Sequence, residues 1–216
     1  MESGQSWPAT HLFKRALIAD DHVIVAQAIC HLLSQVSAAV DMVTSGEALV
    51  ASVRDSPPDV VIADVSIPGV NGIDAMKILH DEGHKTPLVF LSVHDEPSMA
   101  AMALRAGAMG YLPKSAAGEE LLRALGDVVE GRTYVASTLT ARMAADPAPV
   151  QPRLTPSHLR VLELVAQGKR PKEIAGEMGL SVRTIESHKY MMMQELGVRT
   201  TLALLRRAKE KGYISA

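Results

Sequence analysis

Aromatic residues and cysteines are scarce in this chain of 216 residues. Phe, Trp and Tyr together account for 3% of the sequence, and Cys30 is the single cysteine. A single cysteine excludes an intramolecular disulfide framework and a cysteine-rich metal site, and it is typical of a protein from a reducing compartment. The shortage of aromatic side chains argues against a protein that stacks nucleobases. It also argues against a sensor that encloses a small ligand in an aromatic pocket.

Apolar runs long enough to cross a bilayer are also absent, because charged residues interrupt each of them. The first ten residues are polar and do not resemble a signal peptide. We therefore expect a cytoplasmic protein that does not enter a membrane. Hydrophobic residues nevertheless make up 47% of the sequence, which is enough for one large core or two small ones built from Ala, Val, Leu, Ile and Met.

Positive charge is scarce in the first part of the chain and concentrated in the last part. Residues 1–151 contain 10 Lys and Arg against 18 Asp and Glu, a net charge of −8. Residues 152–216 contain 12 against 6, a net charge of +6. Such an asymmetry is hard to reconcile with one compact unit. It predicts two domains, of which the second binds a polyanion.

The segment from Pro58 to Gly72 carries the clearest signal of a reactive side chain. It contains the apolar, β-branched run Val60 to Ala63, which is typical of a buried parallel strand, and Asp64 follows that run directly. In an open α/β sheet, the carboxyl ends of the strands are where loops deliver reactive groups, so Asp64 is expected at that edge. The alternative is an Asp that merely forms a turn.

Strands and helices are predicted to alternate five times in the first 132 residues. The expected strands are short apolar runs at residues 15–21, 40–43, 58–64, 87–92 and 110–114. The expected helices have apolar residues at helical spacing and lie at residues 22–36, 47–54, 72–82, 97–106 and 118–130. This alternation predicts an α/β fold with a five-stranded, doubly wound parallel sheet covered on both faces.

The alternation ends after Gly131. Residues 133–145 have room for one further helix, and the proline-rich segment 146–152 is typical of a semi-rigid, extended linker. Four short helices are then expected at residues 156–167, 171–178, 182–196 and 200–211, each with a glycine near its end. The expected organisation is an α/β domain at 14–132, a linker at 133–152, and a separate small all-α domain of four helices at 153–216.

Polar side chains stand at the ends of four of the predicted strands. They are Asp20 with Asp21, Asp64, Ser92, and Lys114. In a doubly wound sheet these ends meet at one crevice. Three neighbouring carboxylates repel one another, and a hard divalent cation such as Mg²⁺ relieves this repulsion. With an ammonium and a hydroxyl group beside the ion, the site is predicted to stabilise a transferring phosphoryl group, with Asp64 as the nucleophile.

These residues resemble those of a known family. Asp20-Asp21, the run from Asp64 to Gly72, Leu91-Ser92 and the segment from Gly110 to Lys114 are similar to the receiver domain of bacterial two-component response regulators. The resemblance implies that Asp64 accepts a phosphoryl group from a sensor histidine kinase. It further implies that Mg²⁺ is held by Asp21, Asp64, the Ser66 carbonyl and, partly through water, Asp20. Ser92 and Lys114 would bind the phosphoryl oxygens, and Ser92 and Tyr111 would form a conformational switch.

Two residues of this site leave alternatives open. Tyr111 is assigned to the switch because an aspartyl phosphate that draws Ser92 inward leaves space for an aromatic ring. The alternative is a Tyr that simply fills the core. Val93 stands where the family usually has a smaller residue after the hydroxyl, and its bulk is expected to hinder water or a phosphatase. The lifetime of the phosphorylated state is therefore not predicted.

The segment from Pro171 to Leu196 is predicted to form a helix, a sharp turn and a second helix, with Gly179 in the turn and Ser181 as the cap of the second helix. One face of the second helix is expected to be buried: Val182, Ile185, Met192 and Leu196. The opposite face carries Arg183, Glu186, Ser187 and Tyr190. Any surface helix has such a polar face, so this pattern alone favours DNA binding only weakly.

A second resemblance favours DNA binding more strongly. Leu154-Thr155-Pro156, Lys172 to Ala175, Leu180 to His188 and Leu196 to Arg199 are similar to the LuxR-type four-helix DNA-binding domain, and with the receiver they resemble the NarL/FixJ subfamily. The resemblance implies that the helix from Val182 enters the major groove of double-stranded promoter DNA. The implied base contacts are Glu186, Ser187 and Tyr190, and the implied phosphate contacts are Lys172, Thr184, His188 and Lys189. The alternative is that His188 and Lys172 only complete the surface.

Several positions depart from the LuxR-type pattern. His158 replaces the usual Glu, which braces the domain by pairing with a basic residue, and Pro171 replaces the usual Asn. Met191 and the pair Gln194-Glu195 replace polar and basic residues late in the recognition helix. Fewer cations mean fewer phosphate contacts, and each lost contact lowers the log–log salt slope by about 0.9. We therefore expect DNA binding that is weak or depends on a homodimer, formed upon phosphorylation or on DNA.

The expected function is that of a transcriptional regulator, not an enzyme, in which phosphorylation of Asp64 is relayed through Ser92 and Tyr111 to dimerisation and DNA binding. One rival is a Mg²⁺-dependent aspartyl phosphatase of the haloacid dehalogenase kind. That class normally needs a second Asp two positions after the first, and this chain has Ser66 there. Another rival is a DNA-binding module gated by a partner protein without phosphorylation. The kinase, the promoters and the sign of regulation are not predicted.

Overall fold

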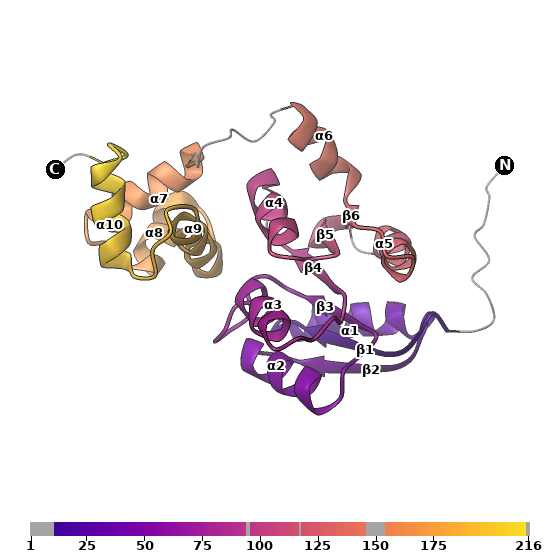
Figure 1. Cartoon of the computed structure of the whole chain (residues 1–216). Coiled ribbons are helices and arrows are strands. Elements are labelled where there is room, and N and C mark those ends of the chain that lie inside the picture. Colours follow the sequence, from indigo (N-terminus) through magenta and orange to yellow (C-terminus); the bar gives the residue numbers. More distant parts are fainter. Residues whose placement is uncertain (1–10, 94–95, 117, 146–153, 215–216) are drawn as a thin grey trace. The chain divides into compact units, whose positions relative to one another are not determined.

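The computed structural model of the protein describes residues 11–93, 96–116, 118–145 and 154–214 (Figure 1). The chain divides into two compact units, Met1–Asp146 and Pro147–Ala216. The proline-rich linker expected at residues 146–152 lies outside the described residues. No helix in the described part of the chain is both long and apolar enough to span a bilayer.

The first unit contains one parallel sheet. Its strands are β1 (Phe13–Ala19), β2 (Ser37–Val43), β3 (Val60–Ala63), β4 (Leu88–Ser92), β5 (Gly110–Pro113) and β6 (Tyr134–Val135). The strand order is β2-β1-β3-β4-β5-β6, and all pairs are parallel. The predicted α/β class and parallel sheet are confirmed, but the sheet has six strands and not five. The sixth strand, β6, was not predicted because two residues leave no periodic pattern in the sequence. It is recognised in the structure by its pairing with β5.

Helices follow the strands as the alternation predicts. They are α1 (Val23–Leu33), α2 (Gly46–Asp55), α3 (Gly72–Asp81), α4 (Pro97–Arg105) and α5 (Glu119–Val129). α2 and α3 lie side by side on one face of the sheet (Figure 1). After β6, α6 (Ser137–Ala145) is the further helix for which the sequence has room, and it packs against α4.

The register of β1 and β3 determines where the predicted site lies. Ala19 of β1 is paired with Ala63 of β3, so Asp20 and Asp64 leave adjacent strands at the same level. The backbone N–H of Asp64 donates to the carbonyl of Ala19 at 2.8 Å, which extends the pairing by one residue. The strand that follows β1 in the chain, β2, lies on one side of the β1–β3 pair, and the strand that follows β3, β4, lies on the other side. In open α/β sheets, the crevice at such a switch in direction is the usual ligand site.

The core of the first unit is mainly aliphatic. β3, β4 and β5 are buried along their whole length, as the apolar runs predict. Two of the few aromatic rings lie inside this core: Phe90 and Tyr111 are cross-strand neighbours with ring centroids 6.5 Å apart and planes inclined by 51°. Each large buried side chain contributes about 1.5–3 kcal/mol relative to an exposed one, so the sheet is a rigid base for the residues at its edge.

The second unit consists of four helices, as predicted. They are α7 (Pro156–Ala166), α8 (Pro171–Met178), α9 (Val182–Glu195) and α10 (Thr201–Glu210). Gly179 has a φ of 66°, in the left-handed region, and this conformation ends α8 tightly enough for α9 to follow after a turn of three residues. Ser181 accepts a hydrogen bond from the backbone N–H of Thr184 and so caps α9. The predicted helix-turn-helix is therefore present in α8 and α9.

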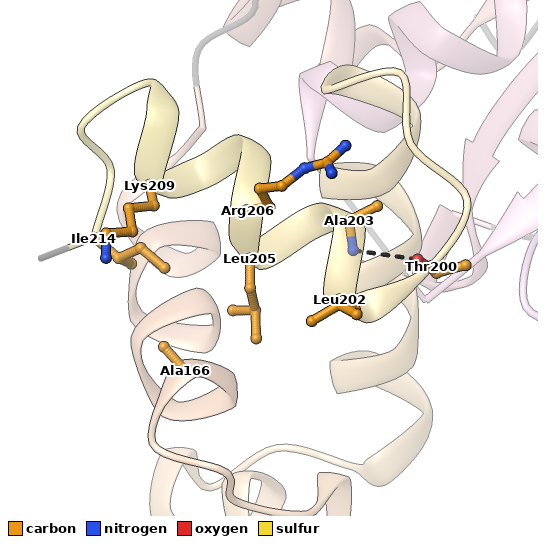
Figure 2. A pocket seen from close by; sticks show the side chains of 8 residues that line it. All are labelled: Ala166, Thr200, Leu202, Ala203, Leu205, Arg206, Lys209 and Ile214. Atoms are coloured by element: carbon orange, nitrogen blue, oxygen red, sulfur yellow. Dashed lines mark hydrogen bonds between the residues drawn. The ribbon is translucent and has the colours of Figure 1, made fainter. Parts of the chain in front are cut away.

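A pocket of about 570 Å³ lies in the second unit between α10 and the end of α7 (Figure 2). Leu205 projects from α10 toward α7, where Ala166 lines the pocket. Arg206 and Lys209 add positive charge to a lining that is otherwise mainly apolar. None of the residues predicted to contact DNA lines this pocket, so it is distinct from the predicted DNA-reading surface.

Candidate functional site

Lys114 and two buried carboxylates form the centre of the site. Ser92 at the end of β4 is paired with Pro113 of β5, so Lys114 leaves the sheet next to Ser92. The ammonium group of Lys114 donates to Asp20 and lies 2.9 Å from Oδ2 of Asp64. Asp20 and Asp64 are 2% and 1% exposed. Burying two carboxylates is costly, and pairing with the largely buried Lys114 offsets much of that cost.

The backbone around Asp64 fixes the orientation of its carboxylate. Oδ1 of Asp64 accepts a hydrogen bond from the backbone N–H of Ser66 at 3.1 Å, while Oδ2 faces Lys114. Gly72 begins α3 directly against this residue, because a Cβ at position 72 would lie only 2.4 Å from the carbonyl oxygen of Asp64. The nucleophile predicted from the sequence is thus held at the strand end by its own loop.

Asp21 completes an acidic cluster that fits a divalent cation. Asp20, Asp21, Asp64 and His22 each offer one ligand atom, and these atoms all lie within 4.8 Å of one another. Three carboxylates and the ammonium of Lys114 carry a formal charge of −2, which a dication neutralises. Carboxylate oxygens are ligands that Mg²⁺ prefers. The residues present therefore fit the ion that the sequence predicts.

Ser92 and Tyr111, the residues of the predicted switch, are both fully buried. The Tyr111 ring packs beside Phe90 inside the domain, which is the inward position that the predicted switch requires in one of its two states. Val93, directly after Ser92, is 52% exposed. The bulky side chain at this position is thus accessible to solvent, and its effect on water or a phosphatase remains a prediction.

The start of α2 braces the loop that follows Asp64, a role that the sequence did not indicate. The backbone N–H of Gly46 donates to the carbonyl of Pro68 at 3.1 Å, and Oε1 of Glu47 accepts from the N–H of Val70 at 3.0 Å. The helix dipole alone explains an acidic residue in the first turn, so no contact with the loop was predicted for Glu47. Gly46 was the residue that could have indicated this contact. Glycine weakens a helix, so a glycine at the start of one suggests that another segment of backbone lies close by.

The residues predicted to contact DNA lie on α8 and α9. Lys172 is exposed in the first turn of α8, and the other six lie on α9, the second helix of the helix-turn-helix. Glu186 is exposed and pairs with Lys189 at 2.7 Å, while the hydroxyl of Thr184 is 2.8 Å from that of Ser181. The position of α9 after the turn is that of a recognition helix.

Side-chain exposure on α9 differs from the prediction at three positions. Val182, expected to be buried, is 44% exposed, because it is the first residue of the helix. Ser187 and His188, expected to contact DNA, are 6% and 4% exposed. Their contacts with DNA remain predictions that this exposure does not support.

His158 takes part in a capping box at the start of α7, a role that differs from the pairing with a basic residue expected of the usual Glu. Its Nδ1 accepts a hydrogen bond from the backbone N–H of Thr155 at 3.3 Å, and the Thr155 hydroxyl accepts from the N–H of His158 at 3.2 Å. This reciprocal pair is a capping box in which an imidazole nitrogen replaces a carboxylate oxygen. The His158 ring also meets His188 of α9 edge to face, with centroids 5.2 Å apart.

Glu177 joins α7 and α8 on the surface of the second unit. It pairs with Arg160 of α7 at 2.8 Å and with Lys169 in the turn before α8. The hydrogen bond from Lys169 and the charges of both cations hold the pKa of Glu177 below its ordinary value. Because all three side chains are substantially exposed, this network adds little to stability, but it fixes cations that would otherwise be available to a polyanion.

Comparisons with known proteins agree with this geometry. Residues 16–126 match the family model described as the response regulator receiver domain, and residues 152–208 match that of bacterial regulatory proteins of the luxR family. The response regulator UvrY of Escherichia coli (strain K12) is 30% identical over 210 residues, which cover 93% of this chain and 95% of UvrY. The transcriptional regulatory protein UhpA of the same strain is 35% identical over 195 residues, or 88% and 95% of the two chains.

Solved structures resemble the whole chain as well. RcsB from Salmonella enterica serovar Typhimurium, bound to promoter P1flhDC in the presence of the phosphomimetic BeF3⁻, has a TM-score of 0.60 and 28% sequence identity. The match covers 90% of this chain and 97% of that one. A structure of two RcsB dimers bound to two parallel DNAs matches equally well, with a TM-score of 0.60.

Proposed function

Because the chain belongs to the response regulators that join a receiver domain to a LuxR-type DNA-binding domain, and so is a transcriptional regulator of a two-component system, we propose that Asp64 is its phosphoacceptor. The observation that carries this proposal is the contact of Lys114 with both Asp20 and Asp64 at the carboxyl edge of the sheet. One cation next to a buried nucleophile is suited to stabilising the negative oxygens of an incoming phosphoryl group.

In the proposed reaction, a carboxylate oxygen of Asp64 attacks the phosphorus of a phosphohistidine on the sensor kinase. The new P–O bond forms as the P–N bond breaks, and the departing imidazole keeps the electron pair and takes up a proton. Lys114 and the Ser92 hydroxyl bind the phosphoryl oxygens. Asp20, Asp21, Asp64 and the Ser66 carbonyl would hold Mg²⁺, which when bound supplies positive charge to those oxygens.

Ser66 also argues for a phosphoacceptor rather than a phosphatase. It is two positions after Asp64, where the aspartyl phosphatases described above need a second carboxylic acid. A serine there cannot serve as the general acid for a leaving alcohol or as the base for the attacking water. The proposed outcome is therefore labelling of the chain at a single position and not steady turnover of a substrate.

The second unit supplies the output of the proposed signal. α9 would enter the major groove, with Glu186 and Tyr190 facing base edges and Lys172 and Lys189 facing phosphates. Movement of Ser92 and Tyr111 upon phosphorylation would favour a homodimer, and two linked readers bind DNA more tightly than one. The DNA-bound dimers of RcsB, a protein similar to this chain, support this part of the proposal.

The experiment that tests the phosphoacceptor uses acetyl phosphate with Mg²⁺ and intact-protein mass spectrometry. The wild-type chain should gain one phosphoryl group, and Asp64→Asn should gain none. Asp81→Asn, which removes an exposed acid at the end of α3, is the matched control and should be labelled at the wild-type rate. Labelling of Asp64→Asn at that rate would refute the assignment, and steady release of phosphate by the wild type would revive the phosphatase.

The DNA-binding part is tested by enrichment of genomic DNA fragments on the full chain with and without phosphorylation. Phosphorylation should raise both the affinity and the dimer fraction, and equal affinity would favour the module gated by a partner protein. On an enriched fragment, Lys172→Ala should lower the log–log salt slope by about 0.9. The control Lys209→Ala on α10 should leave that slope unchanged.

A further inference from the structure

The acidic cluster contains one nitrogen donor, the imidazole of His22, to which the proposed function gives no role. Nδ1 of His22 lies 3.2 Å from Oδ1 of Asp20 and 3.3 Å from Oδ1 of Asp21. A nitrogen of His22 also lies within 4.8 Å of a carboxylate oxygen of Asp64. His22 thus belongs to the same set of ligand atoms as the three carboxylates, although hard cations such as Mg²⁺ favour oxygen ligands.

Backbone contacts hold His22 next to the carboxylates. Its backbone N–H donates to Oδ1 of Asp20 at 2.9 Å, and its carbonyl accepts from the N–H of Ala26, which is the first hydrogen bond of α1. The backbone of the residue is therefore fixed on both sides of its Cα atom, and its ring nitrogen Nδ1 lies within hydrogen-bond distance of Asp20. The side chain is 47% exposed, so an ion can reach it from solvent.

The spacing of these donor atoms fits one metal ion. Ligand atoms at about 2.1 Å from a metal are about 3.0 Å apart when adjacent in an octahedron and about 3.4 Å apart in a tetrahedron. The distances from His22 Nδ1 to the two carboxylate oxygens, 3.2 and 3.3 Å, fall between these values. Lys114 approaches the other oxygen of Asp20, Oδ2, so the ammonium group and the imidazole face different sides of that carboxylate.

We propose that His22 is a ligand of the ion bound at this cluster, so that the site binds first-row transition dications through one imidazole nitrogen and the carboxylates of Asp20 and Asp21. This inference rests on the proposed function for the existence of the metal site and goes beyond it in the ligand and the metal class. Imidazole suits Co²⁺, Ni²⁺ and Zn²⁺, whereas Mg²⁺ gains nothing from it. His22 therefore makes the site more selective for transition metals than its carboxylates alone would be.

The test uses Co²⁺ and Mg²⁺ on the full, untagged chain. Isothermal titration gives the affinity for Co²⁺, and competition gives the affinity for Mg²⁺. Proton NMR of the Co²⁺-loaded chain reports a hyperfine-shifted, exchangeable imidazole N–H when a histidine is coordinated. His22→Ala should lose this resonance and bind Co²⁺ about tenfold more weakly or worse, with Mg²⁺ affinity changed by less than about twofold. His31→Ala, an exposed histidine in the last turn of α1, is the matched control and should behave as the wild type.

Three results would overturn the inference: an unchanged Co²⁺ affinity in His22→Ala, survival of the shifted N–H in that variant, or an equal loss of Co²⁺ and Mg²⁺ affinity. Labelling by acetyl phosphate separates this failure from failure of the proposed function. If wild type and His22→Ala are both labelled at Asp64 with Mg²⁺ while the cobalt result is negative, only the role of His22 is wrong. If cobalt binds through His22 but Asp64 is never labelled, the metal site stands and the phosphoacceptor is wrong.

Discussion

Lys114 lies with its ammonium group 2.9 Å from Oδ2 of Asp64, and the same group donates a hydrogen bond to Asp20. The two acids leave neighbouring strands at the same level, and the lysine leaves a strand two positions further along the sheet. The single positive charge of Lys114 therefore lies between the negative charges of two buried carboxylates. The predicted effects of substitution at this position follow from that arrangement.

Replacing Lys114 by Met should destabilise the first unit strongly. Removing one partner of a buried ion pair costs about 3–5 kcal/mol, because the remaining charge stays buried without compensation. We expect a loss near the lower end of that range in urea denaturation without divalent cations, and a partial recovery on addition of Mg²⁺. Lys77→Met, at a partly exposed position of α3, is the control and should change stability little. Equal stability of the two variants would show that Lys114 does not compensate the acids.

Val93→Ala should shorten the life of the phosphorylated chain. Val93 is 52% exposed and directly follows the buried Ser92, so its side chain is expected to hinder water that approaches the phosphoryl group. Removing two methyl groups is expected to speed loss of the phosphoryl group by about two- to fivefold, which corresponds to about 1 kcal/mol or less in activation free energy. The rate is measured by mass spectrometry after acetyl phosphate is removed. A slower loss in Val93→Ala would mean that the valine does not screen the site.

Tyr111 is expected to matter for stability through its ring and for signalling through its position. It is fully buried beside Phe90, so Tyr111→Ala should cost about 3–5 kcal/mol in urea denaturation. Tyr111→Phe keeps the ring and should cost about 1 kcal/mol for the lost hydroxyl interactions. If Tyr111 is part of the switch, the Phe variant should be labelled normally but show a changed gain in DNA affinity upon phosphorylation. An unchanged gain in DNA affinity would mean that Tyr111 only packs in the core.

The capping box of α7 should be visible in amide hydrogen exchange. His158→Ala removes the acceptor for the Thr155 N–H, and an N-terminal cap is worth about 1 kcal/mol, or about a fivefold faster exchange at that amide. Thr155→Ala should have a similar effect at the His158 amide. Thr200→Ala removes the equivalent cap of α10 and should leave the exchange of α7 amides unchanged. Protection at Thr155 that survives in His158→Ala would show that the imidazole is not the cap.

Tyr134 should make the first unit sensitive to high pH. Its hydroxyl donates to Oε1 of Glu120 at 3.1 Å, and burial together with the negative charge of Glu120 raises the pKa of Tyr134 above its ordinary value. A group whose pKa is raised on folding stabilises the fold below its unfolded pKa, here about 10, and this contribution is lost as pH rises through the folded pKa. The advantage of the wild type over Tyr134→Phe in urea midpoint should therefore be full at neutral pH and shrink as the pH rises above about 10.

Glu120→Gln provides the second variant for this titration. Without the negative charge of Glu120, one of the causes of the raised pKa disappears, so the loss of stability at high pH should be smaller than in the wild type and complete at lower pH. A difference between wild type and Tyr134→Phe that stays constant over the whole pH range would contradict the assigned role of Tyr134.

The sequence predicted that the acidic and basic side chains of the site meet, because parallel strands bring their ends to one edge. Asp20, Asp64 and Lys114 are each the first residue after an apolar run, and the pairing of those runs brings them together in the structure. The order of the strands was not predicted, because apolar runs alone do not contain it. β6 escaped prediction because two residues carry no period, and its existence depends on the neighbouring edge of β5.

Side-chain contacts between distant segments could not be predicted from the sequence. Glu47 supports the loop after Asp64 only because α2 returns next to that loop, a fact set by the chain path over the sheet. The contact of His158 with His188 likewise depends on how α7 meets α9. On α9, helical periodicity correctly placed Ile185 and Met192 in the core. It failed at Val182, because a residue in the first turn lacks the neighbours that a residue in mid-helix has.

The close approach of Gly46 to the loop has a consequence for anyone who transplants this domain into a chimaera. A Cβ at position 46 would lie 1.7 Å from the carbonyl oxygen of Val70, so even alanine forces the two backbones apart. The loop that follows Asp64 and the beginning of α2 must therefore be inherited together. A hybrid receiver that takes residues 64–72 from one parent should also take residues 45–47 from the same parent, or the carboxylate of Asp64 will be misplaced.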